Sequence, residues 1–163
     1  SFKSFAENLG IRIVPNSNLR LLRSGDAVLG EKIIVAGYPF GRIISGAIKI
    51  TAGVVSATRG LSDDTGQFQF DAAVQPGSSG GPIFDKSGNV IGIVVAGIAK
   101  NRIAKAFGAV PELSNFGIKA SVVNKFLKSR GLPIYGSDAN KVVSTEKIAE
   151  FAKRQTLMVS CSQ

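Results

Sequence analysis

A glycine- and serine-rich stretch, Gln75-Pro76-Gly77-Ser78-Ser79-Gly80-Gly81-Pro82, separates two apolar runs and limits what the middle of the chain can form. Three glycines within residues 77–81 disfavour the interior of a helix or a strand. They suit a tight loop with positive φ angles whose main-chain N–H groups point outward. Such amides can converge on an oxyanion beside a hydroxyl, which makes Ser79 the candidate nucleophile. The alternative interpretation is an ordinary Gly/Ser turn between two strands.

Short runs rich in β-branched and aromatic residues surround this stretch and predict strands. We expect these strands at residues 32–39, 44–51, 54–57, 67–74, 81–85, 90–96 and 116–120. Gly53 indicates a β-bulge or a close backbone approach. The turn residues at 86–89 join two of the strands into an antiparallel hairpin. Strands this short and this regularly spaced are typical of an antiparallel barrel or sandwich.

Two helices and a final strand are expected after these strands. Ser121 is predicted to cap a helix that runs to Arg130, with Gly131 as its stop. Ser144 is predicted to cap a second helix, and residues 156–160 to form a strand. The predicted fold is therefore all-β, an antiparallel six-stranded barrel with a C-terminal helix and a small helix–strand extension. The expected division is a lead-in segment (1–18), the barrel (19–131) and the extension (132–163).

The amino-acid composition limits which catalytic groups, metal sites and binding partners we expect for this chain. The chain contains no histidine and a single cysteine, Cys161, so it lacks the commonest general base and the commonest nitrogen ligand for zinc. We expect neither a metal site nor a cofactor. The net charge is +9, but the basic residues are dispersed and aromatic residues make up only 7%. We therefore expect no nucleic-acid binding, and no apolar run reaches the ~18 residues of a membrane span.

The spacing Gly77-x-Ser79-x-Gly81 also fits the nucleophile elbow of α/β-hydrolases. That motif requires a helix directly after the serine. Here Pro82-Ile83-Phe84-Asp85 and a hairpin turn follow instead, so the α/β-hydrolase interpretation fails.

The stretch from Asp71 to Pro82 closely resembles the nucleophile segment of trypsin-like serine proteases of the bacterial HtrA/Deg-like branch. Residues 30–41 and 51–57 resemble the first strands of that family's second barrel. Residues 89–93 and 115–118 resemble the two strands that wall its substrate pocket. The similarity covers about residues 19–130, and it implies the chymotrypsin fold and serine endopeptidase activity.

The resemblance also implies roles for individual residues. Ser79 corresponds to the nucleophile, and the N–H groups of Gly77 and Ser79 to the oxyanion hole, with Ser78 between them. Ala73 corresponds to the base of the specificity pocket. The walls of that pocket correspond to Val95, Ala96, Gly97, Phe116 and Gly117. Because none of these residues is acidic, we expect small or medium aliphatic side chains at the cleavage site.

Two departures from the family pattern limit this prediction. Ser78 stands where the family usually has Asn, which is a mild change because loop amides bind the oxyanion. The family's His and Asp belong to its first barrel, but this chain has no His, and its first Asp is Asp26. The chain therefore resembles the second barrel alone, and an unassisted serine is a weak nucleophile. We expect the isolated chain to be nearly inert.

Several expectations about partners follow from the resemblance. The substrate is expected to be a peptide or an unfolded protein, in an extracytoplasmic location. One barrel of a two-barrel protease exposes the apolar surface that normally faces the other barrel. We expect this surface to be covered by an N-terminal barrel that carries His and Asp, or by self-association. Because residue 1 is Ser, we expect the chain to be a processed product or a fragment. The alternative function is a non-catalytic, protease-like module that binds peptides or proteins.

Overall fold

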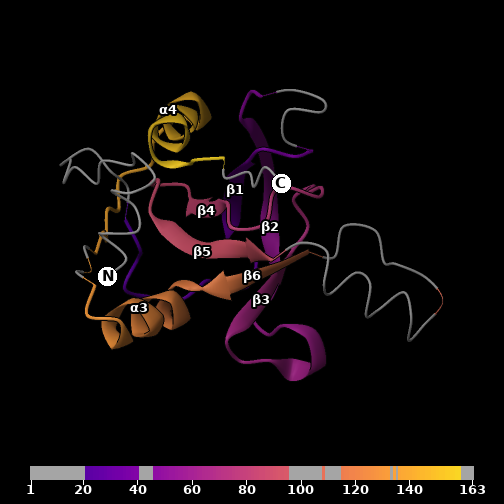
Figure 1. Cartoon of the computed structure of the whole chain (residues 1–163), viewed down its shortest axis with the longest axis vertical. Coiled ribbons are helices and arrows are strands. Elements are labelled where there is room, and N and C mark those ends of the chain that lie inside the picture. The colour runs from indigo at the N-terminus through magenta and orange to yellow at the C-terminus, as the bar shows by residue number, and fades with distance from the viewer. Residues whose placement is uncertain are drawn as a thin grey trace, which may run out of the picture.

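The computed structural model describes residues 21–40, 46–95, 108, 115–132, 134 and 136–158. Within these residues, six antiparallel strands close into a barrel in the order β1-β2-β3-β6-β5-β4 (Figure 1). The strands are β1 (Lys32–Gly37), β2 (Lys49–Ala57), β3 (Gln67–Phe70), β4 (Pro82–Asp85), β5 (Val90–Val95) and β6 (Asn115–Lys119). The predicted six-stranded antiparallel barrel is confirmed.

The second strand differs from the prediction, because β2 runs through Gly53 without a break. Gly53 pairs with Ile33 of β1, and a Cβ at Gly53 would lie 2.5 Å from the main-chain nitrogen of Ala72. The glycine therefore permits a close backbone approach, the second of the two predicted alternatives. The irregularity in the β2–β3 pairing lies further on, between Val55 and Ala57.

β3 ends at Phe70, earlier than the predicted strand over residues 67–74. The Asp71 N–H donates to the carbonyl oxygen of Val54 at 3.2 Å. In return, the Asp71 carboxylate accepts from the Val54 N–H at 2.6 Å. Because a side chain takes the place of the main-chain acceptor, the ladder stops here and the chain turns out of the sheet. This turn starts the glycine-rich loop.

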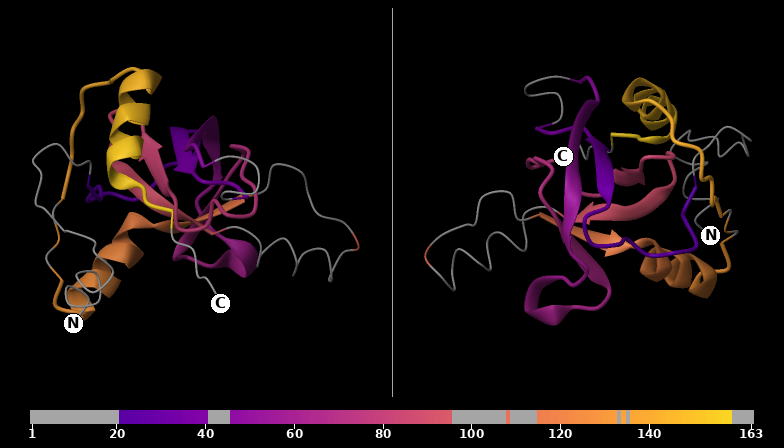
Figure 2. Two further views of the ribbon diagram at one scale, coloured as in Figure 1. Left: turned by 45° about the horizontal axis from the view of Figure 1, so that its top comes forward. Right: turned by 180° about the vertical axis from the view of Figure 1, so that it is seen from behind.

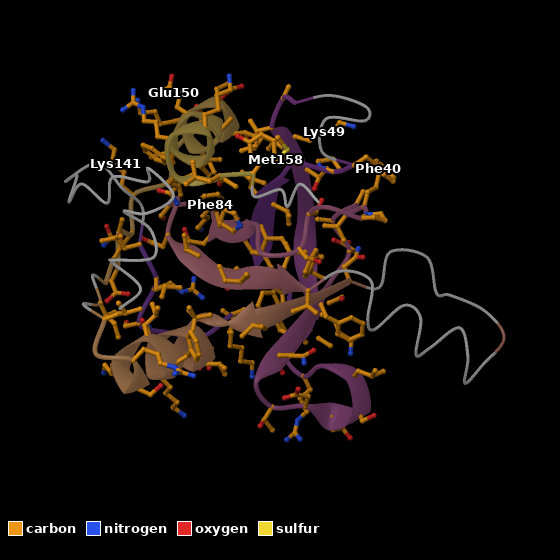
Figure 3. All side chains as sticks on the ribbon, in the orientation of Figure 1. Phe40, Lys49, Phe84, Lys141, Glu150 and Met158 are labelled. Carbon is orange, nitrogen blue, oxygen red and sulfur yellow. The ribbon has the colours of Figure 1, made fainter. Side chains whose placement is uncertain are left out.

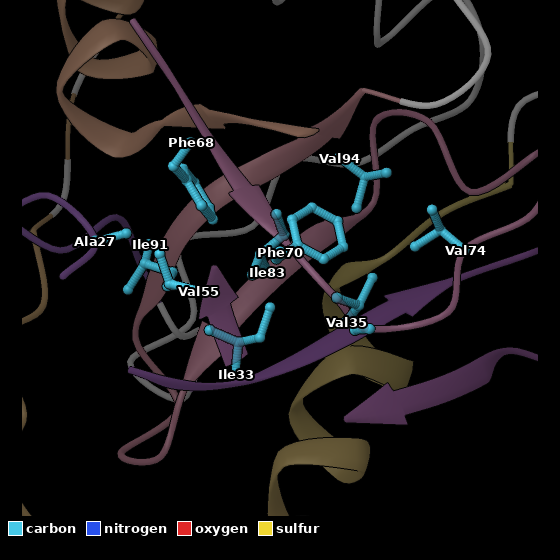
Figure 4. Close-up of a cluster of buried hydrophobic side chains, with 11 residues drawn as sticks. Ala27, Ile33, Val35, Val55, Phe68, Phe70, Val74, Ile83, Ile91 and Val94 are labelled. Carbon is cyan, nitrogen blue, oxygen red and sulfur yellow. The ribbon is translucent and has the colours of Figure 1, made fainter. Parts of the chain in front are cut away.

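Alternate side chains of the strands fill the barrel (Figure 4). Phe68 and Phe70 lie at its centre, with ring centroids 6.1 Å apart. Two glycines of β5 and β6 make room for the Phe68 ring, since a Cβ at Gly92 would lie 2.6 Å from it and one at Gly117 would lie 2.7 Å from it. The interior is thus a packed core, and the site belongs to the rim.

The predicted hairpin of β4 and β5 is confirmed, and a buried carboxylate organises its turn. Asp85 accepts from the N–H groups of Ser87 (2.8 Å) and Asn89 (2.9 Å). The Arg23 guanidinium donates to the same carboxylate at 3.2 Å. Arg23 also pairs with Glu31, and the hydrogen bond to Glu31 is the main cause that raises the pKa of Arg23. This network fastens the segment around Arg23 to the hairpin.

The helix α3 (Ala120–Ser129) follows β6 directly. The predicted cap is wrong, because Ser121 lies inside the helix and makes no capping hydrogen bond. Its hydroxyl donates instead to the carboxylate of Asp26 at 3.0 Å. Gly131 follows the helix with a φ of +67°, in agreement with its predicted role as the stop.

The helix α4 (Thr145–Gln155) covers part of the outer face of the barrel, at the opposite end from α3 (Figure 2). Its predicted cap is confirmed, since the Ser144 hydroxyl accepts from the Lys147 N–H at 3.3 Å. Ile148 and Ala152 are fully buried and pack against the outer face of the barrel. No helix in the described part of the chain is long and apolar enough to cross a membrane.

Residues 156–158 follow α4 without forming a strand, although a strand was predicted over 156–160. The Thr156 N–H bonds back to Ala152, and its carbonyl oxygen accepts from the Tyr38 hydroxyl at 3.3 Å. A closed barrel also has no edge at which a further strand could add. Residues 159–163 and the predicted lead-in segment, 1–18, lie outside the described residues.

Candidate active site

The loop between β3 and β4 contains a tight turn at residues 75–78. The Ser78 N–H donates to the carbonyl oxygen of Gln75 at 3.0 Å, and Gly77 has a φ of +96°. Pro76 and Gly77 are the residues that a type II turn favours at its two central positions. The turn is fastened to the segment that follows β1, because the Phe40 N–H donates to the Pro76 carbonyl oxygen at 2.7 Å.

A second turn follows at residues 78–81. The Gly81 N–H donates to the carbonyl oxygen of Ser78 at 3.0 Å, and Gly80 has a φ of +84°. β5 holds this turn, because the Gly80 N–H donates to Val94 and the Val94 N–H donates to Gly81, both at 2.9 Å. Ser79 therefore lies in a loop that main-chain hydrogen bonds hold on both sides.

The two adjacent serines have opposite environments. Ser78 is only 6% exposed, and its side chain faces Gly37 of β1. Ser79 is exposed to solvent. Of the two hydroxyls, Ser79 is thus the one that a substrate could approach. The structure brings Gly77, Ser78 and Ser79 together on the rim of the barrel; their catalytic roles remain predictions.

The predicted pocket residues lie on two sides of the loop. Ala73 is exposed at the start of the loop. Val95 and Phe116 lie opposite each other in the β5–β6 pair and pack together. Gly117 faces the core, so it could contribute only main-chain atoms to a pocket. Ala96 and Gly97 lie outside the described residues.

Two polar side chains whose role the sequence did not indicate hold the segment that leads into the first turn. The Asn115 side-chain amide donates to the carbonyl oxygen of Ala72 at 2.8 Å, and Asn115 is buried. The Thr51 hydroxyl donates to the carbonyl oxygen of Ala73 at 2.9 Å. The one available signal was a polar residue, Asn115, at the start of an otherwise apolar strand. These two bonds fix the segment that precedes the first turn.

Comparison with known proteins identifies the family to which the chain belongs. A family model described as a trypsin-like peptidase domain matches residues 7–93, more than half of the chain, including both turns. The chain belongs to the trypsin-like peptidase family. Rat serine protease HTR4 is 37% identical to this trypsin-like peptidase domain over 142 residues. A probable periplasmic serine endoprotease of Bartonella henselae, DegP-like by name, is 37% identical over 109 residues.

These matches relate the domain to HtrA/DegP serine proteases, but they cover only part of each relative. The rat match spans 76% of this chain and 28% of the relative. The Bartonella match spans 63% of this chain and 20% of the relative. The crystal structure of the serine endoprotease from Yersinia pestis matches with a TM-score of 0.53 at 20% identity, over 73% of this chain and 36% of that one. This last similarity supports the fold alone.

Proposed function

We propose that this trypsin-like peptidase domain is the second-barrel half of a serine endopeptidase, with Ser79 as its nucleophile. The observation that carries the proposal is the pair of turns that holds an exposed serine between two glycines with φ angles of +96° and +84°. A rigid loop of this kind can turn the N–H groups of Gly77 and Ser79 toward one oxyanion. Donors that are oriented before the substrate binds stabilise the oxyanion of the transition state without a reorganisation cost.

The reaction needs a base that this chain does not contain. Ser79 Oγ would bond to the scissile carbonyl carbon, and its proton would pass to a histidine and then to the leaving amine. Water would then release the acyl group by the same route. The chain has no histidine, so the base and its orienting carboxylate would come from an N-terminal barrel. Removing the histidine base of a triad lowers kcat by about 10⁶-fold, so this chain alone would be nearly inert.

The proposed specificity pocket is apolar. Its base would be Ala73, and its walls Val95, Ala96, Gly97, Phe116 and Gly117. No residue of this set could pair with Lys or Arg, so cleavage after small or medium aliphatic residues of a peptide or unfolded protein is expected. A cleavage profile dominated by Lys and Arg would contradict this assignment.

Exposed apolar side chains support a partner for the barrel. Leu29 is 68% exposed and Phe126 is 56% exposed. In a single barrel of a two-barrel protease, an N-terminal barrel or a second copy of the chain would cover such apolar surface. The periplasmic name of the Bartonella relative supports an extracytoplasmic location for this protein as well.

A second candidate function is a non-catalytic module that binds peptides, which the absence of histidine from the chain favours. Incubation of a peptide library with the longest natural form of the protein separates the two functions. The endopeptidase cleaves the library and a Ser79→Ala variant does not. Peptide binding without cleavage by either form would favour the module and overturn the endopeptidase proposal.

A further inference from the structure

A small cavity lies behind the nucleophile loop, where the loop meets the ends of β1 and β2. Its volume is about 190 Å³. Val35 and Val74, which also belong to the barrel core, form its apolar part. Figure 4 shows Val74 at the edge of that core, opposite Ala27. Lys49, which pairs with Gly37 across the first two strands, forms part of its polar lining, at the end of the barrel where Phe40 lies (Figure 3).

The buried residue Ser78 also lines this cavity. Ser78 is 6% exposed. Both hydrogen bonds that it makes within the described residues use main-chain atoms, with Gln75 and Gly81 as partners. Its Oγ would lie 3.4 Å from a Cβ placed on Gly37. A buried hydroxyl in this position can donate to a group that enters the cavity.

The charge of the lining selects an acidic ligand. Among the described residues of the lining, Lys49, which is exposed to solvent, contributes a cation, Ser78 contributes a donor, and none is Asp or Glu. A hydrogen bond between a charged donor and a carboxylate is about twice as strong as one between neutral groups. Since an apolar protein cavity of about 150 Å³ accommodates benzene, this one is large enough for a group of about six carbon atoms.

We propose that this cavity binds a branched aliphatic side chain with a carboxylate beside it. The side chain packs on Val35 and Val74, and the carboxylate accepts hydrogen bonds from Lys49 and Ser78. The C-terminal residue of a peptide and a free short-chain carboxylic acid both have this chemistry. The occupant touches Ser78, where the two loop turns meet, and so it stiffens the loop that carries Ser79. Binding itself does not depend on the proposed catalysis.

Titration of the ¹⁵N-labelled chain by NMR tests the site with four probes. They are 4-methylpentanoate, its neutral amide, the peptide Gly-Gly-Leu and the same peptide with an amidated C-terminus. We expect saturable shifts of the Gly77 and Ser78 amides with one or both acids, and binding at least about 10-fold weaker for the matching amides, which corresponds to 1.4 kcal/mol. Binding of the peptide acid alone assigns the site to a chain terminus, and binding of both assigns it to small acids as well.

Matched variants locate the ligand. Lys49→Gln and Ser78→Ala should each weaken binding of the acid at least about 5-fold. Lys32→Gln makes the same charge change at the other end of β1 and should leave the affinity unchanged. The ¹⁵N spectrum of each variant reports its folding directly. Equal affinity for acid and amide, an unaltered affinity in folded Lys49→Gln, or no loop shifts at millimolar concentrations would each overturn the proposal, whatever the activity of Ser79.

Discussion

The two loop glycines with positive φ angles give a matched pair for testing how the loop is held. A Cβ at Gly77 would lie 2.7 Å from the Tyr38 carbonyl oxygen and 2.9 Å from the Phe40 nitrogen. A Cβ at Gly80 would meet nothing within 4 Å. The φ angles are similar, +96° and +84°. Gly77→Ala therefore adds a steric clash to the backbone strain, whereas Gly80→Ala adds the strain alone.

The magnitude follows from these two contributions. An L-residue forced into the left-handed region costs about 1–2 kcal/mol, which applies to both variants. The clash at Gly77 is with main-chain atoms, which cannot move aside without breaking the 2.7 Å bond from the Phe40 N–H to Pro76. Loss of that bond costs about 1–2 kcal/mol more. We expect Gly77→Ala to lower the free energy of unfolding by about 2–4 kcal/mol, and Gly80→Ala by about 1–2 kcal/mol.

Urea unfolding of the purified chain, followed by circular dichroism, measures both values. The difference between the variants corresponds to roughly 2–8 °C in Tm for a domain of this size. Gly30→Ala is a control away from the loop, since Gly30 has a φ of +77° and open space around it. If Gly77→Ala and Gly80→Ala agreed within about 0.5 kcal/mol, the proposed contact between the loop and the segment that follows β1 would be refuted.

Three further perturbations test the surrounding structure. Ser144→Ala should destabilise the chain by about 1 kcal/mol in the same assay, because it removes the cap of α4; an unchanged midpoint would contradict the cap. Asp85→Ala should cost about 3 kcal/mol, since it breaks a buried carboxylate network; a loss below about 1 kcal/mol would refute the network's importance. Hydrogen bonds from the Ser24 N–H and hydroxyl lower the pKa of Asp138. The ionised carboxylate therefore stabilises the folded chain at neutral pH, and this stabilisation is lost as the pH falls through the lowered pKa. Ser24→Ala should raise the pKa of Asp138 in a carboxyl ¹³C titration, and an unchanged pKa would contradict the assigned cause.

Structural features that depend on residues adjacent in the sequence could be predicted from the sequence. Pro76 and Gly77 set the first loop turn through their own φ preferences, and Ser144 caps a helix that begins at the next residue. The Ser121 cap failed because its hydroxyl bonds to Asp26, which is 95 residues away. A local pattern does not reveal a competing partner at that distance.

The site contacts that the sequence did not predict also join residues that are distant in the sequence. Pairing of β3 with β6 and with β2 brings Asn115 to the carbonyl oxygen of Ala72 and Thr51 to that of Ala73. The cavity likewise depends on tertiary packing, because it brings Lys49 of β2 close to Ser78 of the loop between β3 and β4. Sequence patterns indicated the strands, but the register that creates these contacts comes from packing of the core.

The central proposal is that Ser79 is a nucleophile whose base lies outside this chain. The most direct measurement is labelling by a fluorophosphonate probe, with the modified residue mapped by mass spectrometry. It compares the longest natural form of the protein, its Ser79→Ala variant and the present chain.

We expect the natural form to be labelled at Ser79 alone, the variant not at all, and the isolated chain at least about 10³-fold more slowly. Labelling at Ser78, or equally fast labelling of the isolated chain, would contradict the account. Absence of labelling in a folded natural form would support the binding module instead.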